Sequence, residues 1–455
     1  MRVLILCMAL LTTVQLPAQV KLDLQKCIDI AIENNLGLRQ SANQVTLAEV
    51  AVIQRKFAFL PNAGAQIGVN RNIGQTVDNF SQQIAESPTT ANPSLFASIG
   101  LFNGLSKWNA LKSAQADVAA AQYSLEDLEN DIRLSVALSY FQVIFSEDQL
   151  DIALERVQLL EKQVAQTETL LEAGTLTKGD LYTLKAQLAT EKVNLVNAGN
   201  QMRQNLLNLI LAMNEDPTDE YDLERPDIEG FMLTNNLDPV KSVVMESENY
   251  NPGLKSLKFQ IVSREHQVKM SRAGLMPSLS LSYGIGSFYS SSARPLLGFE
   301  NDPNEGLLPI YGDPPGFFSQ IGDNIGQGLG LSLNIPIFQN YQVRQGVRNA
   351  QINLENARLS YENEKNNLYQ SILIAYQDAE ASFATYEATL EQIQAANISF
   401  EFAKTRYEAG VIDFNNYLET LNNKTRAERE LLAAKYDFIL KSKILDLYQG
   451  KPLEF

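Results

Sequence analysis

The stretch Ser278-Leu-Ser-Leu-Ser-Tyr-Gly-Ile-Gly286 alternates large apolar residues with serine and glycine. Successive side chains of a β-strand point to opposite faces, so the pattern predicts a strand with one apolar face and one face of small polar residues. Gly328 to Ile337 repeats the pattern, and weaker versions run from Ala65 to Val69 and from Leu95 to Leu101. Each segment has roughly the ~9 to 11 residues that a tilted membrane strand needs.

A soluble sheet packed on a helix would show the same alternation. The N-terminal sequence helps to distinguish a soluble sheet from a membrane sheet. Arg2 precedes an apolar run from Val3 to Leu11, and Leu16-Pro17-Ala18 offers a cleavage site. Residues 1–18 therefore read as a secretory signal peptide. Cys7 lies inside the apolar run behind a short charged region, and we do not expect it to be lipidated. An export signal favours the interpretation that the alternating segments are membrane strands with one face toward lipid.

Four strands cannot close a barrel, and an open sheet edge in lipid leaves backbone groups unpaired. Several copies must therefore share one barrel. Eight strands from two copies would be filled by side chains, whereas twelve strands from three copies leave a passage. The polar segments Asn72–Pro93 and Phe288–Asn324 are expected to be loops on the outer side of the membrane.

The chain contains an internal duplication. Asn35, Gly37 and Leu38 recur 216 residues later, and from Phe102 onward the matching residues lie 236 residues apart. The second copy therefore carries an insertion between its two strands. We divide the chain into a first repeat at residues 19–216, a linker at 217–236 and a second repeat at 237–455. Each repeat is expected to hold a helix, two β-strands and a long helical hairpin.

The hairpins follow from two long segments. Lys107–Ala173 contains neither proline nor glycine, which predicts a helix of roughly 100 Å. Gly346–Ala409 also contains neither residue apart from Gly346 itself, which predicts a second long helix. Glycine then ends each helix and lets the chain reverse, at Gly174 and at Gly410. Coiled-coil spacing predicts the apolar seams. The seam residues are Leu150, Leu154, Val157, Val164 and Leu171 before the first turn, and Leu181, Leu184, Leu188 and Leu195 after it.

Composition excludes several classes of function. The chain has 53 acidic and 37 basic residues and a formal charge of −16, so no nucleic-acid partner is expected. One histidine and two cysteines argue against a zinc site, a disulfide framework or a Cys-His nucleophile. We find no phosphate-binding lysine loop and no serine-nucleophile motif. No enzyme activity, cofactor or metal is expected, and energy for any transport has to come from partners.

The duplicated plan resembles the TolC-like outer-membrane efflux family. The marks are Leu60-Pro61 and Met276-Pro277 entering strands, Phe102 and Phe338 leaving them, and the paired Glu-Ala-Gly turns. The resemblance implies an α+β membrane protein, a trimeric 12-stranded β-barrel with four strands per chain, continuous with a long α-helical coiled-coil tunnel. It places the barrel in the outer membrane of a Gram-negative cell, in contact with lipid, and the helices in the periplasm.

By the same resemblance the homotrimer is the exit duct of a tripartite efflux pump or a type I secretion system, exporting small molecules or proteins. Its partners would be a periplasmic adaptor protein and an inner-membrane pump driven by protons or ATP. The cargo stays open. The alternative is a non-transporting, envelope-spanning coiled-coil structural protein or adhesin, which would conduct no ions.

The family also suggests site residues. Asn416 and Glu419 match the acidic pore constriction, although Asn416 stands where an aspartate is usual. Asp180 and Tyr407 match two members of a polar bridge that holds the tip shut, whereas Ile412 replaces its arginine. The residues that would contact the adaptor are Gly174, Thr175 and Leu176 at the first turn, and Gly410, Val411 and Ile412 at the second.

Overall fold

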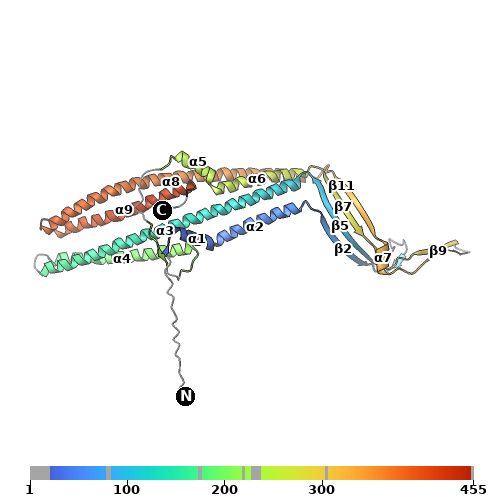
Figure 1. Cartoon of the computed structure of the whole chain (residues 1–455), viewed down its shortest axis with the longest axis horizontal. Coiled ribbons are helices and arrows are strands. Elements are labelled where there is room, and N and C mark those ends of the chain that lie inside the picture. Colours follow the sequence, from blue (N-terminus) through green and yellow to red (C-terminus); the bar gives the residue numbers. More distant parts are fainter. Residues whose placement is uncertain are drawn as a thin grey trace, which may run out of the picture. The chain divides into compact units, whose positions relative to one another are not determined.

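The computed structural model describes residues 21–77, 84–172, 177–217, 221–226, 237–302 and 306–451 (Figure 1). The expected signal peptide, Gly174, Thr175, Leu176 and most of the expected linker lie outside the described residues.

The two copies of the sequence fold into helices of equal length. The first copy holds α1 (Leu24–Asn34), α2 (Leu36–Phe57), α3 (Ser106–Glu172) and α4 (Lys178–Ala212). The second holds α5 (Val240–Tyr250), α6 (Pro252–Ala273), α8 (Gln342–Glu408) and α9 (Phe414–Tyr448). The lengths are 11, 22, 67 and 35 residues in both copies. The insertion therefore leaves every helix intact.

Four strands form one antiparallel sheet in the order β2 (Asn62–Arg71), β5 (Thr89–Asn103), β7 (Ser278–Gly286) and β11 (Gly326–Asn334). These are the four segments that the alternation predicts. Two strands differ from the predicted segments at their ends. β5 already begins at Thr89, so part of the expected loop 72–93 is strand, and β11 ends at Asn334, before Pro336. Proline lacks the N–H that would continue the ladder.

The remaining strands are short. β3 (Gln75–Val77) pairs with β4 (Ile84–Glu86), and β9 (Leu296–Asp302) pairs with β10 (Gly306–Tyr311). The segment expected to be the second outer loop thus contains the β9–β10 hairpin, α7 (Phe317–Asp323) and β8 (Tyr289–Ser290), which pairs with β5. β1 (Lys21–Leu22) and β6 (Asp222–Leu223) form a parallel pair. None of the described helices is long and apolar enough to cross a membrane.

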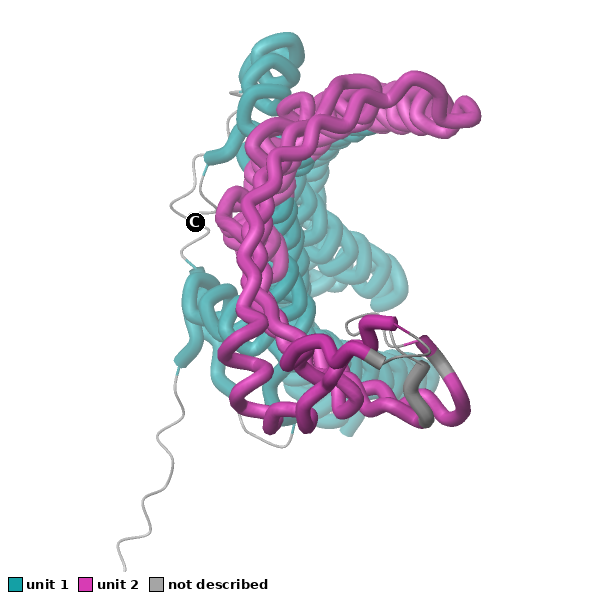
Figure 2. Tube along the Cα trace, turned by 90° about the vertical axis from the view of Figure 1, so that its right-hand side faces the viewer, with its two compact units in different colours: residues 1–44, 121–256, 361–455 teal, residues 45–120, 257–360 magenta. Residues whose placement is uncertain are grey.

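The chain divides into two compact units, coloured separately in Figure 2. The hairpin unit comprises residues 1–44, 121–256 and 361–455, and the sheet unit comprises residues 45–120 and 257–360. Each unit draws segments from both copies of the duplication. The long helices α3 and α8 begin in the sheet unit and end in the hairpin unit.

The hairpin unit is held together by apolar clusters. The largest joins α1 to α3, α4 and α9, with Cys27, Ile28, Val136 and Leu209 almost inaccessible to solvent. A second cluster lies toward the hairpin turns and includes Leu160, Leu184, Phe400, Phe414, Tyr417, Leu418 and Leu421. It takes side chains from both hairpins, so burial of apolar surface binds one hairpin to the other.

The expected seam of α3 is wrong at one position. Leu154 is 43% exposed, whereas Ala153, Val157 and Leu160 are buried. Spacings of four and three residues from 153 to 160 follow the heptad, and Leu154 falls outside it. On α4, Leu181 and Leu184 are buried as expected, but the same heptad continues through Glu191.

Candidate functional site

The register of the sheet gathers its large apolar side chains on one face. Leu281 lies opposite Leu331 on one side and Ile99 on the other, and Leu95 lies opposite Ala65. These side chains point away from the small polar face in all four strands, because pairs opposite each other share a face. Leu331 remains 66% exposed and Ile67 74% exposed. The sheet unit thus presents an apolar surface that none of its described residues covers.

The opposite face carries small and polar residues and a single large ring. Phe96 lies across from Gly64, and a Cβ atom at position 64 would come within 2.6 Å of the ring. A side chain at position 64 would therefore force the Phe96 ring to shift away from β2. Ser280 and Ser332 pair directly on this face. A wet interior tolerates such residues, whereas lipid does not.

Both edges of the sheet are open among the described residues. β2 pairs with β5 alone, and β11 pairs with β7 alone. An apolar sheet with two unpaired edges cannot lie in lipid by itself, because every exposed N–H and C=O would lack a partner.

At the hairpin turns, helix caps fix where α4 and α9 begin. The Thr177 side chain accepts from the Asp180 backbone N–H at 3.3 Å, and Asp180 accepts from the Thr177 backbone N–H at 3.0 Å. In α9 the cap is Asp413, which accepts from the Asn416 backbone N–H at 2.8 Å. Position 416 is the counterpart of Asp180, so α9 carries its carboxylate at the cap instead of one turn later. A carboxylate at either position stabilises the N-terminus of its helix.

Gly410 ends α8 in the left-handed region, with φ of +70°. Its N–H donates to the Tyr407 carbonyl at 2.9 Å, and Val411 N–H reaches back to the Arg406 carbonyl at 2.8 Å. These bonds satisfy carbonyls that the helix end leaves free. Val411 is 62% exposed, whereas Ile412 packs on the cluster of Leu160 and Phe414. The turn therefore offers an exposed apolar tip.

Tyr407, one member of the expected tip bridge, lies in a cluster of aromatic rings. Tyr407 stacks on Tyr417 with ring centroids 5.0 Å apart, and Phe414 lies 5.8 Å away. Burial raises the pKa of the Tyr407 hydroxyl, and the charge of Asp180 raises it further. Ile412, in place of the expected arginine, adds apolar packing to the same cluster. Asp180 accepts a hydrogen bond from the Thr177 hydroxyl, and the bridge itself stays a prediction.

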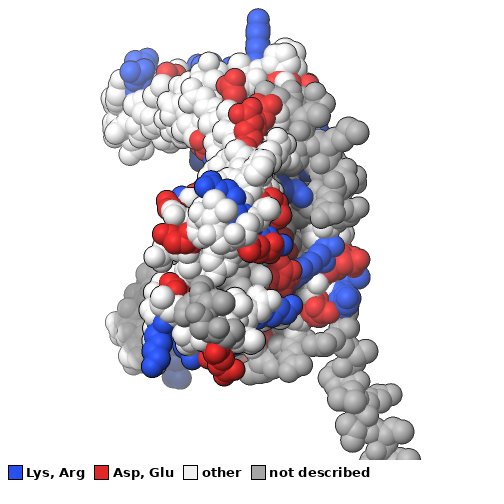
Figure 3. All heavy atoms as spheres, turned by 90° about the vertical axis from the view of Figure 1, so that its left-hand side faces the viewer, with Lys and Arg blue, Asp and Glu red and all other residues white. Residues whose placement is uncertain are grey.

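The expected constriction residues Asn416 and Glu419 are both exposed on α9. They begin a polar band along one side of the helix, because residues three and four apart share a face. The exposed band continues through Asn423, Arg426, Glu430 and Asp437. Figure 3, which looks from the left-hand side of Figure 1, shows basic and acidic side chains intermixed on this face.

Sequence reasoning missed a set of polar contacts between the two hairpins. Arg156 on α3 is 4% exposed and donates to Asn422 on α9 at 2.5 Å. Glu191 on α4 is 7% exposed and lies 3.5 Å from the guanidinium of Arg429 on α9. The heptad spacing of Leu181, Leu184 and Leu188 reaches position 191 and could have revealed the buried glutamate.

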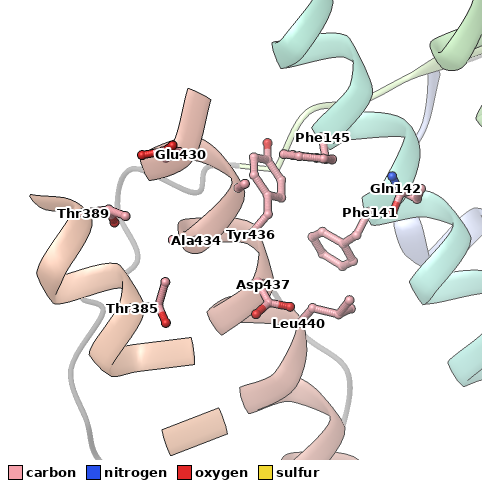
Figure 4. Close-up of a pocket in the computed structure, with 11 residues that line it drawn as sticks. Phe141, Gln142, Phe145, Thr385, Thr389, Glu430, Ala434, Tyr436, Asp437 and Leu440 are labelled. Atoms are coloured by element: carbon pink, nitrogen blue, oxygen red, sulfur yellow. The ribbon is translucent and has the colours of Figure 1, made fainter. Parts of the chain in front are cut away.

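A groove of about 620 Å³ lies beside the part of the exposed α9 band that contains Glu430 and Asp437 (Figure 4). Phe141 and Phe145 of α3 face Tyr436 of α9, with the rings of Phe145 and Tyr436 5.5 Å apart. Tyr436 donates to Asp148 at 2.6 Å, and Glu430 and Asp437 line the groove. Among the described residues, no group of histidine, cysteine and acidic side chains is arranged to hold a metal ion.

Comparison with known proteins finds a family that matches most of the chain. The family model described as "Outer membrane efflux protein" matches residues 27–215 and 243–450. The chain is 24% identical over 413 residues to outer membrane protein TolC of Escherichia coli (strain K12), covering 90% of this chain and 78% of that protein.

Two further similarities agree with it. The pyoverdine export outer membrane protein OpmQ of Pseudomonas aeruginosa is 22% identical over 424 residues, covering 91% of this chain and 80% of OpmQ. A crystal structure of CusC superposes with a TM-score of 0.77 at 16% identity, covering 95% of this chain and 93% of that chain. The fold is therefore that of these channels.

Proposed function

The chain belongs to the outer membrane efflux protein family, and from this premise we propose that three copies assemble into one gated duct through the outer membrane and the periplasm. Family membership makes the chain a non-enzymatic efflux channel of the Gram-negative outer membrane, as the sequence predicts. The assembly, the partners and the cargo are our proposal.

The observation that supports the assembly is the open sheet of β2, β5, β7 and β11. Its apolar face is exposed and both edge strands lack a neighbour among the described residues. If β11 of one copy pairs with β2 of the next, every edge is satisfied. Three copies would supply twelve strands, enough to enclose a passage, whereas two would give a barrel filled by side chains.

The hairpin turns support the proposed contact with an adaptor protein. Gly410 fixes a tight reversal and leaves Val411 exposed, so each copy offers an apolar tip on a rigid helical hairpin. The described hairpins contain no nucleotide-binding motif. An inner-membrane pump, driven by protons or ATP, would therefore supply the energy and the duct would open passively when the pump and adaptor engage it.

Small molecules are the cargo that we propose first. OpmQ is a pyoverdine export protein by name, and CyaE of Bordetella pertussis, 22% identical over 423 residues, belongs to the same set of relatives. A wide aqueous duct discriminates by size and charge, so protein export through the same channel remains the second cargo class.

The assembly is tested by the mass of the protein in detergent and by its conductance. Light scattering coupled to size exclusion should give three copies per particle, and planar bilayers should show discrete channels. A stable monomer that dissolves without detergent would contradict the shared barrel. Stable trimers that never conduct would favour the non-transporting structural protein or adhesin.

A further inference from the structure

The charged residues of the exposed band on α9 include one basic side chain near its start. Arg426 lies seven residues after Glu419, which is close to two helical turns, so the two side chains lie on the same side of α9 about 10 Å apart along its axis. Both are exposed. Any passage that Glu419 borders is therefore bordered by Arg426 as well.

A hydrogen bond holds the guanidinium of Arg426 on this band. Its Nη2 atom donates to Asn423 Oδ1 at 2.7 Å. Asn423 lies one turn nearer the hairpin turn, between Glu419 and Arg426, so this bond draws the guanidinium toward Glu419. Among the described side chains no carboxylate forms an ion pair with Arg426, whereas the neighbouring Lys424 pairs with Glu428 at 3.6 Å.

The other hairpin supplies no charge at the matching positions. Thr183 and Thr190 of α4 stand where the duplication places Glu419 and Arg426 in α9, and both are exposed. At these two levels the charge therefore comes from α9 alone, whereas Asp180 of α4 is the charged counterpart of Asn416.

We propose that Arg426 is a second residue that sets the ion preference of the duct. Its three copies form a basic ring about two helical turns farther from the hairpin turns than an acidic ring of Glu419. The inference rests on the proposed function, because it needs three copies around one axis. The rings have opposite sign and lie within about one Debye length of each other at 0.1 M salt, so each offsets the field of the other. The narrow part of the duct then selects cations less strongly than a ring of Glu419 alone would.

Reversal potentials in planar bilayers test this proposal, with dilute KCl at about 10 mM on one side, where the Debye length is about 30 Å. We expect Arg426→Gln to raise the permeability of K⁺ relative to Cl⁻ about threefold, and Glu419→Gln to lower it by a similar factor. The double variant should return to the parent value. In about 1 M KCl the differences should disappear, because the charges are screened.

Arg203→Gln is the matched control. Arg203 lies on α4, is exposed, and donates to Asn200 Oδ1 at 2.6 Å with the same spacing of three residues. Its replacement removes the same charge from a hairpin of the same chain and should leave the reversal potential unchanged. An equal shift in Arg203→Gln and Arg426→Gln would overturn the proposal, because net charge alone would explain it.

A thiol reagent gives an independent measurement of position. In an Arg426→Cys variant, a cationic methanethiosulfonate added to open channels should restore parent-like ion preference, and an anionic one should increase cation preference. The native Cys27 is fully buried and should not interfere. Arg203→Cys should respond to neither reagent.

The possible results distinguish failure of the basic ring of Arg426 from failure of the proposed duct. A shift with Glu419→Gln but none with Arg426→Gln overturns the basic ring and leaves the duct intact. Conducting channels in which neither residue shifts the reversal potential remove the whole band from the narrow part. Trimers without any conductance refute the duct, and the basic ring with it.

Discussion

Arg156 of α3 donates a hydrogen bond to Asn422 of α9, although its guanidinium is buried inside a coiled-coil seam. The Nε and Nη1 atoms have no hydrogen-bond partner among the described residues. Burial lowers the pKa of this arginine, while the charge of Glu191 opposes that effect. The contact joins the two hairpins at a cost in desolvation.

The first prediction concerns this contact. Asn422→Ala should destabilise the protein by about 1 to 3 kcal/mol, because it leaves the guanidinium buried without an acceptor. Arg156→Met should be neutral or stabilising, because an apolar side chain of similar length replaces a poorly satisfied charge. Denaturant midpoints followed by circular dichroism in detergent measure both. Asn200→Ala, which breaks the exposed bond to Arg203, is the control and should change the midpoint little.

If Asn422→Ala proved as stable as the parent, the polar contact would contribute nothing to the packing of the hairpins. A large loss in Arg156→Met would mean that the guanidinium makes stabilising contacts beyond Asn422.

The second prediction concerns the turn after α8. Gly410→Ala should cost about 1 to 2 kcal/mol locally through its positive φ, because a Cβ there would meet no neighbour and only the backbone conformation is strained. Gly410→Asn should cost less. Gly410→Pro should spare the trimer yet abolish export, because it also removes the N–H bonded to Tyr407.

Val411→Asp separates the surface of the turn from its shape. The side chain is exposed, so the trimer and its conductance should persist while export in cells is lost. Normal export by a correctly assembled Gly410→Pro or Val411→Asp variant would contradict the role of this turn in docking an adaptor.

The third prediction concerns the two faces of the sheet. Leu331→Lys should disfavour insertion by about 2 to 4 kcal/mol, because it places a charge on the lipid side of a strand. The adjacent Ser332→Lys points to the other face and should insert normally. Folding into lipid vesicles across a urea series measures the difference. If Ser332→Lys were the more damaging of the two, the faces would have been assigned the wrong way round.

The fourth prediction concerns Cys27, whose side chain is fully buried next to α3. Burial raises the pKa of its thiol from about 9 to about 12, and the charge of Asp23 adds to this. At pH 8 the folded protein should therefore be alkylated about 10³-fold more slowly than the unfolded chain. The neutral thiol is favoured in the fold, so stability from this group should fall as pH rises from about 9 to 12.

Cys27→Ala is the control for that experiment, since the exported chain should then bind no reagent. Labelling that persisted in the unfolded variant would show that Cys7 is retained and that the expected signal peptide is not removed. Fast labelling of the folded parent would mean that the core around Cys27 opens readily.

The strands and long helices could be read from the sequence because their patterns are local. Alternation marks Leu279, Leu281 and Tyr283, and the absence of glycine and proline marks α3 and α8. The β9–β10 hairpin was missed because its apolar residues do not alternate with polar ones: Leu296 and Leu297 are adjacent, as are Leu307 and Leu308. Its register contains an irregularity near Tyr311.

The candidate site was only partly readable for a related reason. Gly410 is signalled by its residue type at a helix end, whereas Glu419 was suggested only by the resemblance to the family. The contact of Arg156 with Asn422 joins residues 266 positions apart. Periodicity within one helix shows which positions are buried, but a polar residue in a seam finds its partner only through tertiary packing.

The equal lengths of the duplicated helices restrict how this chain can change. α3 and α8 match residue for residue, as do α4 and α9. Deleting one residue from a single copy would rotate everything beyond it by about 100° and shorten that rod by about 1.5 Å, which misaligns its heptads against a partner that kept the original length. Drift in length is therefore expected in the segments between strands, where the second copy already carries its insertion, or in whole heptads gained by both copies together.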